Sequence, residues 1–154
     1  MTMAGEHGDF WRFTLEIYGR SQVSPRLIEL QDRDGRDVNI LLYCLYAGLV
    51  LGRRLGRGDI ALLEQAVAGW NMMVTHKLRT IRRDLKPLAG DPQIAELRRA
   101  VQAAELDGER LAQARLQAAL PERAAETPGP ALARANLMAY AGESTHILAD
   151  IVLS

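Results

Sequence analysis

Five basic side chains fall on one face of a predicted helix. At 100° per residue, four of them lie within about 60° of Arg79, whereas the apolar stripe of the helix is centred roughly 130° away. Such a row could hold phosphates, an acidic protein or an RNA backbone, because arginine offers forked donors. The alternative is a solvated face paired with neighbouring carboxylates, for which Asp32, Asp34 and Asp37 are candidates. The row consists of His76, Arg79, Arg82, Arg83 and Lys86.

A Glu-x-x-His pattern, Glu143 to His146, lies in the last predicted helix, and Asp150 follows one turn beyond. Di-iron carboxylate bundles present two metal ligands with this spacing, but they use two such pairs and two further Glu residues. This chain has one pair, because Met73 stands three residues before His76. Metal binding by Glu143, His146 and Asp150 therefore stands beside the alternative of a hydrated helix edge.

Three polar side chains, Asn39, Tyr43 and Tyr46, align on one side of the most apolar helix. A small-molecule site is usually a mostly apolar pocket with a few convergent polar groups. Trp70, on the next long helix, could pack alongside these groups and complete such a pocket. The alternative is that the three groups bond to neighbouring helices as part of an ordinary core.

Two other chemistries are disfavoured. The acidic turn DRDGRD places Gly35 where a calcium loop has its glycine, but leucines then occupy the first and last ligand positions. Cys44, the single cysteine, lies inside the apolar helix, where burial raises the pKa of a thiol and keeps it inert. One cysteine cannot form an internal disulfide, so we expect a reducing compartment, the cytoplasm.

The central element of the predicted fold is the stretch 37–52, which is uncharged after Asp37 and apolar on every side. A helix of that kind must be covered by other elements. Asp37 is predicted to cap it, and Cys44, Gly48 and Gly52 form a stripe of small residues that lets another helix approach closely. We therefore predict an all-α, single-domain bundle of about six helices over residues 1–154, around this central helix.

The other predicted helices follow from periodicity and start signals. A helix over 60–86, capped by Asp59, has apolar residues at helical spacing that predict one buried stripe. The next, after Asp91-Pro92, must be its antiparallel neighbour, and we expect it to kink or split at Gly108. Residues 121–130 have turn composition and predict a surface loop before a last helix over 131–152. Asp9 and Ser24 are the expected caps of two earlier helices.

Size and charge narrow the class further. The 154 residues suit one domain, and 19 basic residues balance 19 acidic ones, so no net field attracts nucleic acid or anionic lipid. No apolar run reaches the roughly 20 residues of a membrane span. The N-terminus lacks the pattern of a secretory signal.

Three ordered segments, FWRFTLEIYG, LIELQDRDGRDVNILLYCLYAG and WNMMVTHKLRTIRRDLK, carry a resemblance over the first two-thirds of the chain. The chain resembles a bacterial helical family catalogued only as a domain of unknown function. The resemblance implies a soluble helical protein and no activity, cofactor or partner.

We therefore expect a non-enzymatic interaction or adaptor module that contacts a protein partner through the basic row. The alternatives are a metal- or small hydrophobic-ligand-binding bundle, even a metalloenzyme, and, third, an RNA binder. No cofactor is predicted. Nucleic acid is disfavoured because no aromatic residues interleave the basic row. A homo-oligomer remains open, since a bundle face can also pair with its own copy.

Overall fold

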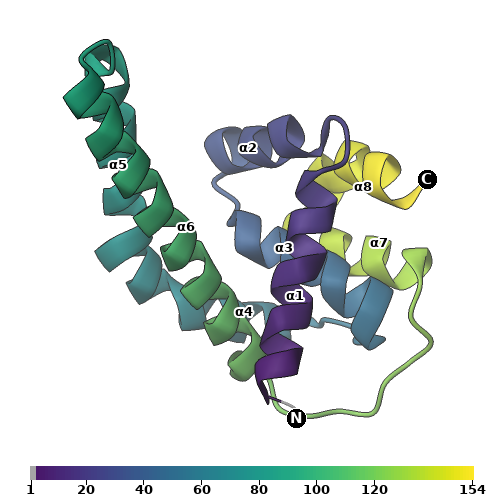
Figure 1. The fold of residues 1–154 in the computed structure, drawn as a ribbon. Helices are drawn as coiled ribbons and strands as arrows, with labels where there is room; N and C mark the ends of the chain where they lie inside the picture. Colours follow the sequence, from purple (N-terminus) through teal and green to yellow (C-terminus); the bar gives the residue numbers. More distant parts are fainter. Residues whose placement is uncertain (1–2) are drawn as a thin grey trace.

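The computed structural model describes residues 3–154, with side chains from residue 8 on. The regular structure of this part of the chain is entirely helical, which confirms the predicted all-α domain. Figure 1 shows a body of helices from which one helical hairpin projects. None of the described helices is long and apolar enough to cross a membrane. The body contains α1 (Met3–Tyr18), α2 (Val23–Asp34), α3 (Val38–Tyr46), α7 (Pro130–Ala141) and α8 (His146–Leu153).

Helix α3 is the centre of the body, as predicted, and all 9 of its residues are buried. Asp37 caps it by accepting a hydrogen bond from the Ile40 amide at 3.0 Å. The helix continues as a wider turn, η1 (Ala47–Leu51), where Gly48 lies so close to the backbone of Ala133 that no Cβ fits between them. Gly48 is thus the point at which α7 packs onto the stripe of small residues, whereas Gly52 lies against the backbone of Glu126 in the loop before α7. Other helices do not cover the end of η1, where Leu51 is exposed.

One continuous helical run forms the projecting side of the molecule: α4 (Arg57–Trp70), the wider turn η2 (Asn71–Thr75) and α5 (His76–Leu85). A short turn, η3 (Lys86–Leu88), reverses the chain into α6 (Pro92–Ala119), which returns antiparallel to α5. Asp91 caps α6, as its position before Pro92 predicted. The run begins earlier than expected, because Gly56 is its N-cap and Asp59 accepts from the Gly56 amide from within the first turn.

The hairpin beyond His76, here called the arm (residues 76–106), has no buried residue. The predicted single buried stripe over 60–86 is therefore wrong in its second half. Ile60, Leu63 and Val67 are buried against the body, whereas Ile81 on α5 is exposed. The reason is that α5 packs chiefly against α6, because the arm extends past the body (Figure 1).

Helix α6 is unbroken at Gly108, contrary to the expected kink. The glycine lies buried against η2, where an added Cβ would sit 3.4 Å from Thr75 Oγ1. Its carbonyl oxygen accepts a hydrogen bond from Trp70 Nε1 at 2.9 Å. Close packing of α6 on η2 thus offsets the low helix propensity of glycine, which costs about 1 kcal/mol relative to alanine.

Residues 121–129 form the predicted loop, which runs around the lower edge of the body from α6 to α7 (Figure 1). Arg123 holds it through a two-pronged contact with Asp59 at 2.8 and 3.0 Å. The last predicted helix is divided by η4 (Gly142–Thr145), because Gly142 adopts a left-handed φ of 65°.

Two predicted caps nearer the N-terminus are also wrong. Asp9 lies within α1 and pairs with Arg12 at 3.2 Å, because that helix already begins at Met3. Helix α2 begins at Val23 after Gln22, one residue before the predicted cap at Ser24.

Candidate functional site

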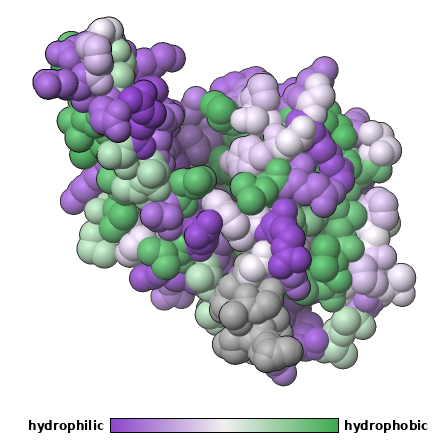
Figure 2. Space-filling view, in the orientation of Figure 1, coloured by the Kyte–Doolittle hydropathy of each residue, from purple (hydrophilic) through white to green (hydrophobic). Residues whose placement is uncertain are grey.

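A hollow surface lies between α2 and the arm. Two adjoining cavities of about 630 and 530 Å³ open there. Figure 2 shows the recess between the arm and the body, bordered by hydrophilic and hydrophobic side chains. We call the two cavities together the cleft. The residues that line both are Gln31, Val38, Arg79, Arg83 and Glu109.

The floor of the cleft is the start of α3. Asp37 accepts from Ile40 N with one carboxylate oxygen and from Asn71 Nδ2 at 2.5 Å with the other. Its own amide donates to the Tyr140 hydroxyl at 2.8 Å. Both carboxylate oxygens are therefore engaged within the protein, so Asp37 contributes structure to the cleft rather than a free charge.

Glu109 joins the arm side of the cleft to the body. Its Oε2 accepts from Asn39 Nδ2 at 2.5 Å and its Oε1 from Arg79 Nη2 at 3.1 Å. Gln113, also buried, donates to Asn39 Oδ1 at 3.2 Å and to Thr14 Oγ1 at 2.8 Å. Burial raises the pKa of the Glu109 carboxyl, although the bonds from Asn39 and Arg79 favour its charged form.

The predicted basic row is divided by the fold. Arg79, whose side chain is 17% exposed, lies 3.5 Å from Glu105 as well as 3.1 Å from Glu109. Arg82 contacts both carboxylate oxygens of Glu105, at 2.5 and 3.3 Å. These two members are engaged with carboxylates of α6, so they do not present free charge to solvent.

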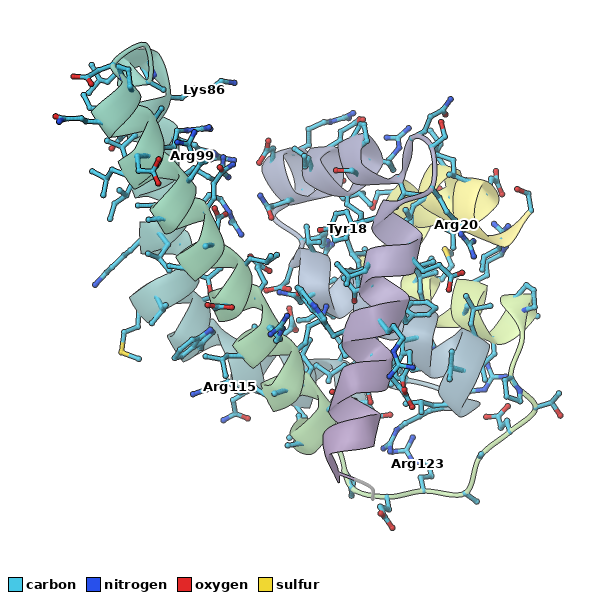
Figure 3. The ribbon with its side chains drawn as sticks, in the orientation of Figure 1. Tyr18, Arg20, Lys86, Arg99, Arg115 and Arg123 are labelled. Atoms are coloured by element: carbon cyan, nitrogen blue, oxygen red, sulfur yellow. The ribbon has the colours of Figure 1, made fainter. Side chains whose placement is uncertain are left out.

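The remaining members of the row are open. Arg83 is 55% exposed, and its one ion pair, with Asp32, is long at 3.8 Å. His76 and Arg83 both line the larger cavity, whereas Lys86 lies exposed near the tip of the arm (Figure 3). The row therefore leaves Arg83 and His76 facing the cleft.

Arg36, which the sequence did not single out, adds a further donor to the same cavity. Its guanidinium lies 5.4 Å from the centre of the Tyr140 ring. Its Nε is buried and has no hydrogen-bond partner among the described residues. Buried polar atoms nearly always have hydrogen-bond partners, so the unpaired Nε of Arg36 is unusual.

The four residues of the predicted ligand pocket are not brought together. Asn39 faces the cleft, but Tyr43 and Tyr46 line another cavity of about 550 Å³ beside Arg53 and Arg123. Both tyrosines also contact the Phe10 ring, with centroid distances of 5.5 and 4.9 Å. Trp70 is elsewhere, with its ring beneath Arg115 and its indole nitrogen bonded to Gly108.

The predicted metal ligands lie on the exposed side of η4 and α8. Glu143 belongs to η4, so the α-helical spacing to His146 is lost. The Asp150 carboxylate is engaged by Arg134 at 2.9 Å. Within the described part of the chain, no three His, Cys, Asp or Glu side chains are grouped as metal ligands.

Cys44 is fully buried in α3, and burial raises the pKa of its thiol far above the ordinary value. A neutral, covered thiol is a poor nucleophile. The cysteine therefore acts as a core residue.

Glu105 and Glu109 were not identified from the sequence as site residues, although they lie one helical turn apart, as do Arg79 and Arg82 on the neighbouring antiparallel helix. Arg79 pairs with Glu109 and Arg82 with Glu105, so residue numbers rise on one helix as they fall on the other. Antiparallel neighbours impose this relation, and the antiparallel arrangement was predicted. Arg36 offered a weaker clue, as a basic residue inside the acidic turn DRDGRD.

Comparison with known proteins identifies a family and nothing further. The model of a family described as a protein of unknown function (DUF2390) matches residues 9–116. This range includes the whole cleft lining and the arm, and it confirms the resemblance seen in the sequence. No curated protein and no solved structure matches the chain.

Proposed function

We propose that this chain, which belongs to the DUF2390 family of proteins of unknown function, is a binding module that receives an acidic segment of a partner protein in the cleft. One observation carries the proposal. The carboxylates of Asp37 and Glu109 are already engaged, whereas in the same cavity Arg83 has only a long, exposed ion pair and Arg36 has no ion pair among the described residues. Guanidinium groups bind carboxylates with two parallel hydrogen bonds, so an acidic side chain is a matching ligand.

The charge of the arm supports the same partner. Residues 76–106 contain seven Lys or Arg and four Asp or Glu in a chain with no formal net charge. Figure 3 shows Lys86 and Arg99 on the projecting part of the arm, away from the body. Such a local excess raises the rate at which an acidic partner meets the cleft without making the whole protein attract polyanions.

Nucleic acid has less support from the same surface. Acidic side chains are interspersed with the basic ones around the cleft, including Asp32, Asp37 and Glu109. Closely spaced phosphates would meet these carboxylates, and Tyr18 is the one Phe, Tyr or Trp among the described residues that line the cleft. Nucleic-acid surfaces normally combine an unbroken basic patch with stacking aromatics.

The experiment is affinity capture from a lysate of the source organism with the full-length chain as bait. Replacing Arg36 and Arg83 together by Ala is expected to remove a captured protein that the native chain retains. The matched control replaces Lys77 and Arg99 by Ala, because these exposed residues carry the same charge but do not line the cleft. Circular dichroism establishes that each variant is folded, and Arg83→Glu alone replaces the double variant if Arg36→Ala unfolds.

The control should retain the captured protein. Loss of that protein to the same extent in both double variants would reject the cleft as the site. A captured protein that is released by nuclease treatment would contradict the proposal in favour of nucleic acid.

A further inference from the structure

The cleft has a second end with a different character. The smaller cavity is lined by Tyr18, Ile28 and Leu106 as well as by Arg83. Ile28 on α2 is 49% exposed and Leu106 on α6 is 51% exposed, although both border a hollow between two helices. Large apolar side chains left open in a concavity mark an interaction site more often than scattered ones do.

We infer that the segment bound in the cleft is amphipathic, with acidic residues at Arg36 and Arg83 and bulky apolar residues beside Ile28 and Leu106. This inference rests on the proposed function and adds the chemistry of the partner. Arg83 lines both cavities, so a carboxylate held there lies next to the apolar end. An acidic residue followed within a short distance by a Leu or Phe would satisfy both.

The charged side chains between the basic end and the apolar end of the cleft are already paired with one another. Arg79 and Arg82 are neutralised by Glu105 and Glu109. A ligand crossing this region meets paired charges, which favour neither an acidic nor a basic residue. Positive charge is therefore available at one end and apolar surface at the other, and this complementarity selects a segment with both.

The shape of the cleft favours a chain segment over a compact small molecule. The two cavities adjoin along five shared residues, and each alone has the volume of an ordinary small-molecule pocket. A ligand that fills both must be elongated.

Binding of two labelled peptides to the full-length chain, measured by fluorescence anisotropy, tests the inference. One peptide joins a block of Asp and Glu to a block of Leu and Phe. The other has the same acidic block and replaces the apolar block by Ser and Gly. We expect the first to bind at least about tenfold more tightly, a difference of about 1.4 kcal/mol. The variant Ile28→Ser with Leu106→Ser should remove that advantage, so that it binds the two peptides equally tightly.

The matched control is Leu97→Ser with Leu111→Ser, because both leucines are exposed on α6 and neither lines the cleft. This control should keep the tenfold advantage. Equal binding of the two peptides, or an advantage that survives Ile28→Ser with Leu106→Ser, would overturn the inference.

The outcomes also separate the inference from the proposed function. Binding of the acidic-only peptide that depends on Arg83 supports the function even if the apolar block adds nothing. Failure of both peptides to bind contradicts function and inference together. A dimer of the native chain that dissociates in Ile28→Ser with Leu106→Ser would assign the apolar end to a second copy and overturn the peptide as its occupant.

Discussion

Arg79 on the arm donates to Glu109 across 3.1 Å, and the same carboxylate accepts from Asn39 of the body at 2.5 Å. One carboxylate therefore ties α5 to α3 through α6. The arrangement explains how an arm without buried residues is held beside α2, and why Arg79 is unavailable to a partner. The basic row is thereby divided into Arg79 and Arg82, which are paired with carboxylates of α6, and Arg83, which is exposed.

This division predicts unequal effects on stability. Replacing Arg79 by Ala leaves Glu105 and Glu109 without their shared partner, and we expect it to lower the free energy of unfolding by about 2 kcal/mol. Replacing Arg83 by Ala removes only a long, exposed ion pair and should change stability by about 0.5 kcal/mol or less. Urea denaturation of both variants measures the difference. Similar losses in the two would show that Arg79 is no more structural than Arg83.

The partly buried carboxylate of Glu109 predicts that the stability of the fold depends on pH. Because burial raises the pKa of Glu109 in the folded protein, the folded state binds this proton more tightly than the unfolded state. The contribution of Glu109 to stability is therefore fully present below its unfolded pKa, about 4.3, and is lost as pH rises through the folded pKa. Glu109→Gln removes this loss, so the stability of the variant relative to the native chain should increase from about pH 4 to pH 7.

Unfolding free energies of both chains, measured by urea at several pH values, provide the test. Other titrating groups cancel in the difference as long as they are unaffected by the substitution, and Asp37, Arg79 and Glu105 are the charged groups nearest to Glu109. A relative stability that decreases over this range would mean that the bonds from Asn39 and Arg79 outweigh burial.

The seam between η1 and α7 predicts a packing effect at one glycine. A Cβ at position 48 would overlap the backbone of Ala133, which cannot move aside as a flexible side chain could. Gly48→Ala should therefore lower stability by about 2 kcal/mol or more. Gly69→Ala, in open space within α4, is the control and should stabilise by up to about 1 kcal/mol. Thermal unfolding compares the two, and a Gly48→Ala protein as stable as the control would disprove the close contact.

The sequence predicted this fold where the determinants are local. The apolar run, the Asp37 cap and the spacing of Cys44, Gly48 and Gly52 identify the central helix and its seam, because helix periodicity and capping depend on nearby residues. Gly108 shows the limit. Its low propensity predicted a kink, but the close contact with Thr75 and Trp70 decides the outcome, and no local pattern contains that contact.

The candidate site was predictable in part for the same reason. The basic row follows from helical projection, whereas the engagement of Arg79 and Arg82 depends on how α6 lies against α5. The periodicity of α5 also could not reveal that its apolar residues meet one helix instead of a core. Arg36 enters the site because the turn between α2 and α3 that carries it lines the same cavity as residues of η2 and α5.

We propose above all that the guanidinium groups of Arg36 and Arg83, which have no close carboxylate partner among the described residues, bind a carboxylate ligand. The most direct measurement is a proton–nitrogen correlation spectrum of the full-length chain that resolves arginine Nε–H groups during titration with hexaglutamate. We expect saturable shifts of the Arg36 and Arg83 signals and much smaller shifts for Arg79 and Arg82. Shifts confined to Arg79 and Arg82, or to arginines outside the cleft, would contradict the proposal.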